Sequence, residues 1–225
     1  MKVRLAALFT GGKDSTYAAH LAEDLGELRY LVTMIPQRED SWMFHTVNIG
    51  LASLIAEAYG VEHVAASTSG VKEEELQDLR RVLEGLDVDA VISGAIASNY
   101  QRRRIDKLCQ QLGLKHITPL WGRNSAELLK EMLEAGLRIM VTGVAALGLD
   151  ERWLGRIIDE EALRELLELN RRYGINICGD GGEMETLVLD APWFRYRVEI
   201  LEAERLWDGI SGVYHIRRAE LIPKG

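Results

Sequence analysis

The chain has 225 residues, of which 47% are hydrophobic and 28% are charged, and its formal net charge is −8. This length supports one substantial core, or a main domain with a smaller partner, without disulfides or a structural metal. The composition is that of an ordinary globular protein, and no apolar run approaches the length of a membrane span, so no membrane association is expected. The negative charge disfavours broad binding to a nucleic-acid backbone.

The cysteines and the N-terminal segment limit the compartment and the chemistry. Cys109 and Cys178 lie far apart without Cys-x-x-Cys spacing, which disfavours a zinc site, an iron–sulfur cluster and redox chemistry. The first strand-like segment runs into a glycine turn and lacks the long apolar region and cleavage site of a signal peptide. We therefore expect a cytoplasmic protein.

The first half of the chain alternates short apolar runs with segments of helical period. This alternation is typical of an α/β fold with a parallel sheet covered on both faces, and we expect a Rossmann-like, doubly wound sheet. Helices are expected over residues 45–59, 72–84 and 99–112. The predicted strands are Val3–Phe9, Arg29–Ile35, Glu62–Ala66, Ala90–Ser93 and Lys115–Thr118.

The alternation weakens in the second half. A helix over Ser125–Ala135 and a strand over Leu137–Val144 are followed by a helix capped by Asp159. Residues 194–203 and 213–222 then have the alternating pattern of a strand pair. We predict a nucleotide-binding domain over residues 1–130 and a smaller C-terminal α+β domain over residues 131–225.

A glycine-rich loop follows the first predicted strand, with the sequence Thr10-Gly11-Gly12-Lys13-Asp14-Ser15. Two adjacent glycines allow backbone N–H groups and the positive end of the following helix to approach a phosphate. Lys13 adds a full positive charge, and Thr10 and Ser15 can donate hydroxyl hydrogen bonds. Asp14 repels phosphate, so its expected role is to hold a divalent cation that the phosphates share.

A second interpretation of this loop is structural, since an aspartate cap and a glycine turn suit any connection from a strand to a helix. The loop is not a Walker A sequence, because the four-residue spacer and second Gly-Lys pair are missing. It is not a Gly-x-Gly-x-x-Gly dinucleotide fingerprint either.

The Gly-Gly-Lys-Asp-Ser string resembles the loop of the PP-loop ATP pyrophosphatases, and further strings resemble the diphthine–ammonia ligase family within that superfamily. Thr10 stands where serine is usual and Asp180 where glutamate is more frequent, and both changes keep the chemical group. The matching strings are Ser41-Trp42-Met43-Phe44-His45-Thr46, Ser93-Gly94-Ala95-Ile96-Ala97-Ser98, Tyr100-Gln101-Arg102, Pro119-Leu120-Trp121, Gly148-Leu149-Asp150, Leu154-Gly155-Arg156 and Gly181-Gly182-Glu183-Met184-Glu185-Thr186.

The resemblance implies an ATP-dependent, AMP-forming ligase that converts diphthine on elongation factor 2 to diphthamide with ammonium. It implies ATP and Mg²⁺ as cofactors, with elongation factor 2 and ammonium as partners. The positive charge and N–H groups of the Thr10–Ser15 loop would stabilise the departing pyrophosphate, and Asp14 would bind the magnesium ion. In this interpretation Lys13 and Asp14 are catalytic residues.

Glu183 and Glu185 are the candidates at the second substrate. They follow a glycine turn, and in a strand two carboxylates two residues apart face the same side. Such a pair suits a quaternary ammonium group and an incoming ammonium ion that needs a base, with Glu183 as the preferred base. The structural alternative is a solvent-facing strand after a tight turn.

Other residues are weaker candidates. Gly94 and Ala95 would allow close approach of the nucleotide, and the backbone near Met34 and Ile35 is a candidate for recognising adenine. Of the three arginines 102–104, at most one or two can face a site on a helix. The candidate substrate-binding residues are His45, Tyr100, Arg102, Arg156, Gly181 and Gly182.

Two other functions stay open at the level of sequence. One is a PP-loop ATP pyrophosphatase acting on a different carboxylate or carbonyl, and the other is a regulatory module that binds ATP or AMP without turnover. Lys13, Asp14 and the Glu183–Glu185 pair disfavour the regulatory module. The frequency of two-fold assemblies makes a homodimer the default expectation for the oligomeric state.

Overall fold

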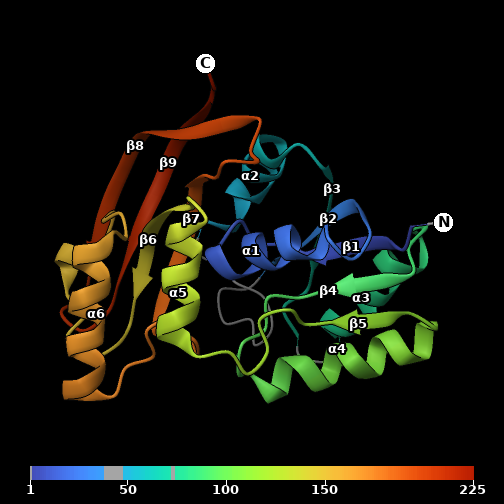
Figure 1. The fold of residues 1–225 in the computed structure, drawn as a ribbon, viewed down its shortest axis with the longest axis horizontal. Coiled ribbons are helices and arrows are strands. Elements are labelled where there is room, and N and C mark those ends of the chain that lie inside the picture. Colours follow the sequence, from blue (N-terminus) through green and yellow to red (C-terminus); the bar gives the residue numbers. More distant parts are fainter. Residues whose placement is uncertain (1, 38–47, 72–73) are drawn as a thin grey trace. The chain divides into compact units, whose positions relative to one another are not determined.

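The computed structural model describes residues 2–37, 48–71 and 74–225. It divides into two compact units (Figure 1). The first unit comprises residues 1–10, 14–57 and 61–121, within the described ranges, and the second comprises residues 11–13, 58–60 and 122–225. The glycine-rich loop therefore contributes residues to both units. The predicted domain boundary at residue 130 stays a prediction.

The first unit is built on a five-stranded parallel sheet with the strand order β3-β2-β1-β4-β5. This order and direction confirm the expected Rossmann-like α/β fold, and each predicted strand is present. The observed ends lie within two residues of the predicted ones. The strands are β1 (Arg4–Leu8), β2 (Glu27–Pro36), β3 (Glu62–Thr68), β4 (Ala90–Ile92) and β5 (Lys115–Ile117).

Helices connect these strands, namely α1 (Lys13–Ala22), α2 (Ala52–Tyr59), α3 (Glu74–Glu84) and α4 (Asn99–Leu112). A short 3-10 helix, η1 (Ile49–Leu51), precedes α2. Leucines of α3 and apolar residues of α4 pack with Ala6, Val32 and Val91 of the strands in one buried cluster. Because alternate strand residues face opposite sides and both Leu5 and Ala7 are also buried, the sheet is covered on both faces.

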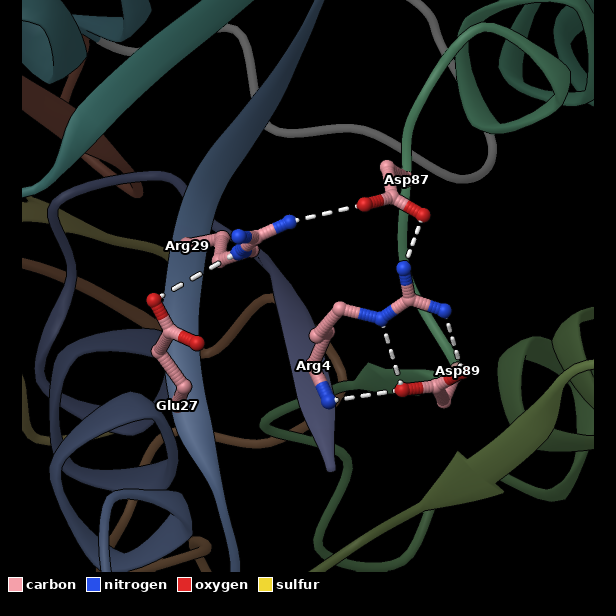
Figure 2. A network of polar contacts seen from close by, with 5 residues as sticks. All are labelled: Arg4, Glu27, Arg29, Asp87 and Asp89. Carbon is pink, nitrogen blue, oxygen red and sulfur yellow. Dashed lines mark hydrogen bonds and ion pairs between the residues drawn. The ribbon is translucent and has the colours of Figure 1, made fainter. Parts of the chain in front are cut away.

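A charged network fixes the amino ends of three neighbouring strands (Figure 2). Arg4 at the start of β1 binds Asp89, which directly precedes β4, at 2.7 Å, and it also pairs with Asp87, two residues earlier in the chain. Arg29 near the start of β2 binds the same Asp87 at 2.8 Å and lies 3.5 Å from Glu27. The hydrogen bonds from Arg4 hold the pKa of the Asp89 carboxyl well below its usual range. The network therefore joins the amino ends of β1, β2 and β4.

The second unit has an antiparallel sheet with the order β7-β6-β9-β8 and two helices, which confirms the smaller α+β part. The predicted cap of its second helix is confirmed, since the Asp159 carboxylate accepts from the Ala162 N–H at 2.8 Å. The expected C-terminal strand pair is present and longer than predicted. The elements are α5 (Ser125–Glu134), β6 (Arg138–Val144), η2 (Glu151–Trp153), α6 (Glu160–Tyr173), β7 (Met184–Asp190), β8 (Tyr196–Trp207) and β9 (Gly212–Pro223).

Among the described residues, no helix combines the length and the apolar character that crossing a membrane requires. Both cysteines are buried, and neither forms a disulfide. Burial raises the pKa of the Cys109 thiol to about 12, so this thiol is a poor nucleophile at neutral pH.

Candidate active site

The strand order places a topological switch point between β1 and β4. From β1 the chain continues through α1 to β2 on one side, and from β4 it continues through α4 to β5 on the other. In open parallel sheets, ligands bind beyond the carboxyl ends of the strands at such a point. The predicted nucleotide loop follows β1, and the loop with Gly94 and Ala95 follows β4. Both loops thus start where this fold binds ligands.

The first turn of α1 is shaped by glycine and by hydroxyl groups. Gly11 has a φ of +78°, a left-handed conformation that favours glycine, and the helix begins two residues later at Lys13. The Ser15 hydroxyl accepts from the Thr10 N–H at 3.2 Å and lies 3.2 Å from the Thr10 hydroxyl. Asp14 lies in the first turn of the helix. The predicted loop is therefore a turn that directs a helix N-terminus, the geometry that an anion site needs.

Lys13 is buried, with 1% of its surface exposed, and its contacts lie in the second unit. Its ammonium donates to the carbonyl oxygen of Cys178 at 2.5 Å, and its backbone N–H donates to the Thr186 hydroxyl at 3.2 Å. The Val188 N–H of the same strand, β7, donates to the Gly11 carbonyl at 2.9 Å. Residues 11–13 are therefore held by β7 and by the segment before it.

Gly94 lies against the first turn of α1. A Cβ atom on Gly94 would be 2.7 Å from the Asp14 carbonyl carbon and 2.8 Å from both the Asp14 oxygen and the Ser15 nitrogen. Only glycine fits at this distance, since all three neighbours are backbone atoms. The structure thus brings Gly94 to the predicted nucleotide loop, and Ala95 is next to it along the chain and partly exposed.

Met34 and Ile35 lie near the carboxyl end of β2. The register pairs β2 with β1 only as far as Val32, whereas β3 pairs with β2 up to Pro36. The Met34 side chain belongs to the buried cluster under α3 and α4, so any contact with a ligand would come from backbone atoms. The backbone role expected for Met34 and Ile35 stays a prediction.

The glycine cluster before β7 forms a longer turn than expected. Gly179, Gly181 and Gly182 all have positive φ, and the strand begins at Met184, so Glu183 is in the turn and only Glu185 is in β7. The expectation that both glutamates belong to one strand is therefore wrong by one residue. The Glu183 carboxylate accepts a hydrogen bond from the Asn176 N–H. The Cβ and Cγ atoms of Glu185 lie beside Gly143 of β6.

The two arginines predicted to bind substrate, Arg102 and Arg156, each contact neighbouring side chains. The Arg102 guanidinium lies 4.3 Å above the Trp121 ring and 3.7 Å from the Asp106 carboxylate. Arg156 makes a two-pronged ion pair with Glu165, at 2.7 and 2.9 Å. The structure therefore gives both arginines structural contacts.

The remaining candidates for substrate binding are Tyr100, Gly181, Gly182 and His45. Tyr100 is exposed and lies 5.1 Å from the Arg104 guanidinium, and Gly181 and Gly182 are also exposed. His45 and the string from Ser41 to Thr46 lie outside the described residues. Across the described ranges, no group of three or more histidine, cysteine or acidic side chains could hold a metal ion.

Sequence reasoning missed several groups near the two loops. The Thr186 hydroxyl accepts a hydrogen bond from the Lys13 N–H. Its place in the string from Gly181 to Thr186 that resembles the family was a signal for a role near the loop. The Cys178 carbonyl carries no signal in sequence, because every residue has one. His63 and His116 carry no sequence signal for a role, and in the structure each binds a hydroxyl group at 2.8 Å, that of Thr33 within β2 and that of Ser93 directly after β4.

Comparison with known proteins identifies the family of this architecture. The model of the diphthamide synthase N-terminal domain matches residues 1–116, and that of the C-terminal domain matches residues 124–222. The diphthine–ammonia ligase of Homo sapiens is 34% identical, with 97% of this chain and 92% of the relative covered. That of Danio rerio is 37% identical, with 88% and 86% covered.

Two further matches are more distant or partial. The diphthine–ammonia ligase of Schizosaccharomyces pombe is 33% identical over 90% of this chain, which spans 37% of that longer protein. A solved structure described as a predicted subunit of tRNA methyltransferase from Methanocaldococcus jannaschii has a TM-score of 0.48 and 18% identity, over 84% of this chain and 98% of that one. Because two consecutive domain models and near full-length relatives agree, the chain belongs to the diphthamide synthase family.

Proposed function

We propose that this protein is an ATP-dependent diphthine–ammonia ligase. The reaction consumes the diphthine carboxylate, ATP and ammonium, and it yields the amide diphthamide, AMP, pyrophosphate and a proton. Diphthine is carried on elongation factor 2, which makes that protein the macromolecular substrate. The observation that carries the proposal is the glycine–lysine loop at the switch point of the sheet, in a chain of this family.

The chemistry requires activation of the carboxylate. An amine does not displace oxide from a carboxylate, whereas transfer of AMP to the carboxylate oxygen breaks the bond between the α and β phosphates and releases pyrophosphate. The resulting acyl phosphate has AMP as a stable leaving group. Ammonia then attacks the carbonyl carbon, the bond to AMP breaks, and the amide forms. The first step needs positive charge where the pyrophosphate departs.

Lys13 and the N-terminus of α1 can supply that charge. In the structure the Lys13 ammonium donates to a neutral carbonyl, that of Cys178. A phosphate oxygen would compete well for this donor, because charge-assisted hydrogen bonds are shorter and stronger than those to neutral acceptors. Gly11 and Gly12 lack side chains that would block a phosphate, and the hydroxyls of Thr10 and Ser15 are candidates for donors to the phosphates.

Asp14 is the proposed ligand of Mg²⁺. Magnesium prefers oxygen ligands and usually takes only one or two carboxylates from the protein, with phosphates and water completing the octahedron. The described residues fit this pattern, since Asp14 offers one carboxylate in the first turn of α1, beside the loop. Bound magnesium would neutralise phosphate charge.

Glu183 and Glu185 are proposed to serve the second step. Ammonium must lose a proton before it can attack, and a carboxylate can both bind the cation and accept that proton. Glu183 also fixes the turn through the Asn176 N–H, so its substitution must preserve this bond to be informative. Glutamine meets the requirement, because its amide oxygen accepts a hydrogen bond and carries no charge.

The test is the formation of AMP and pyrophosphate from ATP with magnesium and ammonium, with and without elongation factor 2 carrying diphthine. We expect turnover only with diphthine and ammonium present, and a loss of about 100-fold or more in Lys13→Ala, as for other single groups that stabilise a developing anion. In Glu183→Gln the ammonium-dependent step should slow most, which is visible as a raised KM for ammonium.

Lys130→Ala and Glu134→Gln are matched controls, because these residues of α5 form an exposed ion pair with each other. Both controls should retain wild-type turnover. If ATP is cleaved without any effect of diphthine, the protein is a PP-loop pyrophosphatase with another carboxylate or carbonyl substrate. If ATP binds and no pyrophosphate forms with any substrate, the catalytic proposal fails and a regulatory nucleotide-binding role replaces it.

A further inference from the structure

A hydrogen-bonded chain of three side chains ends at the carboxyl end of β4. The Ser93 hydroxyl lies 2.8 Å from Nε2 of His116, and Nδ1 of the same imidazole lies 2.6 Å from the Asp106 carboxylate. The three residues come from the end of β4, from β5 and from α4. The His116 side chain is 3% exposed, so water competes little for these bonds.

The chemistry of the two ends sets the direction of the chain. A carboxylate only accepts, so Nδ1 of His116 carries a proton and donates to Asp106. In a neutral imidazole Nε2 is then an acceptor, and the Ser93 hydroxyl donates to it. Burial lowers the pKa of His116, and it outweighs the opposite influence of Asp106, so the neutral form is present at pH 7.

The chain continues to a second aromatic residue. The other oxygen of Asp106 lies 3.7 Å from Nε of Arg102, and the Arg102 guanidinium is 4.3 Å above the ring of Trp121. Asp106, one helical turn after Arg102, is thus oriented from both sides. The carboxylate to which His116 donates is therefore held in a defined position.

The position of Ser93 gives this chain a functional consequence. Ser93 directly precedes Gly94, which touches the backbone of Asp14 and Ser15 in the first turn of α1. A displacement of Ser93 by a few tenths of an ångström would move Gly94 into that turn or away from it. We propose that His116 is a positioning residue of the ATP site, and that the Asp106–His116–Ser93 chain sets the loop after β4 against the nucleotide loop.

The same three residue types form the relay of serine hydrolases, and the backbone argues against that role here. A serine nucleophile needs N–H donors for the oxyanion, and its own N–H is often one of them. The Ser93 N–H instead donates to the Ile117 carbonyl of β5 at 3.1 Å. Positioning therefore explains the geometry better than acyl transfer does.

The inference rests on the proposed ATP site, and it is tested without ligase turnover. His116→Phe keeps the ring volume and removes both hydrogen bonds, Ser93→Ala removes the hydroxyl, and His116→Gln retains an acceptor for Ser93. The first readout is the Kd of a non-hydrolysable ATP analogue. The second is amide hydrogen exchange of residues 93–98 in the nucleotide-free protein.

We expect His116→Phe and Ser93→Ala each to weaken analogue binding about fivefold to tenfold, the effect of one buried hydrogen bond, and to speed exchange in residues 93–98. The double variant should lose no more than either single variant, and His116→Gln should recover part of the affinity. Asp89→Asn is the control for general destabilisation, because Asp89 lies at the amino end of β4, whereas Ser93 follows the carboxyl end of this strand. It should leave affinity and local exchange unchanged.

Three outcomes would overturn the inference. One is wild-type affinity and exchange in both His116→Phe and Ser93→Ala, and another is an equal loss in Asp89→Asn. The third is covalent labelling of Ser93 by a fluorophosphonate, which would make Ser93 a nucleophile. If only the ligase proposal fails, diphthine-dependent turnover is absent, whereas His116→Phe and Ser93→Ala still change analogue binding and hydrogen exchange.

Discussion

Replacing Gly94 with alanine tests whether the loop after β4 must touch the first turn of α1. The added Cβ would lie 2.7 Å from the Asp14 carbonyl carbon, and ordinary contact begins at 3.4 Å, so loop and helix must separate by about 0.7 Å. The atoms met are backbone atoms, which cannot rotate away as a side chain can. Overpacking of this kind costs about 1–3 kcal/mol. We expect the free energy of unfolding to fall by that amount.

The same change should weaken binding of a non-hydrolysable ATP analogue by about tenfold or more, since 1.4 kcal/mol corresponds to a factor of ten. Gly50→Ala is the matched control, because a Cβ there meets no atom within 4 Å and the φ of Gly50 is not positive. Denaturant titration and calorimetric titration measure the two effects. If Gly94→Ala matches the wild type in both stability and affinity, the close contact described here has no part in the site.

Two predictions concern the dependence of stability on pH. The hydrogen bonds from Arg4 lower the pKa of Asp89, so their stabilisation is present above the unfolded pKa near 3.8 and is lost as pH falls towards the folded pKa. The free energy of unfolding of Asp89→Asn should therefore decline less steeply than that of the wild type between pH 5 and 2. Burial lowers the pKa of His63, so the unfolded chain takes up a proton near pH 6.5 before the folded one does. Stability should therefore decrease as pH falls through 6.5, and His63→Gln should reduce this slope; an unchanged slope in either variant contradicts the assignment.

Features that depend on short stretches of sequence were predictable. The strands of the parallel sheet are short apolar runs that end at turn residues, and each was located to within a few residues. Asp159 was recognised as a helix cap because an aspartate before an apolar helical pattern has few other roles. Glycines 11 and 12 marked a turn into a helix, and strand order then placed that turn at the switch point.

Contacts between distant residues were not predictable in the same way. The hydrogen bond from Lys13 to the Cys178 carbonyl joins residues 165 positions apart, and that from Lys13 to Thr186 joins residues 173 positions apart. Period and turn signals carry no information about such pairs. Arg156 shows the related difficulty, since an arginine has the same sequence signal whether its partner is a phosphate or, as here, the carboxylate of Glu165.

The two ends of the parallel sheet use different interactions, and the difference follows from what each end must do. Full charges join the amino ends, where Arg4 pairs with Asp87 and Asp89 at the surface. Further along the strands, His63 holds the hydroxyl group of Thr33 within β2 and His116 holds that of Ser93 directly after β4, and burial lowers the pKa of both imidazoles. A neutral bond fixes a loop without adding a charge that would attract or repel phosphate. In the proposed ATP site the charge would then come from Lys13, Asp14 and the end of α1, so that different residues would control the geometry of the loops and the charge of the site.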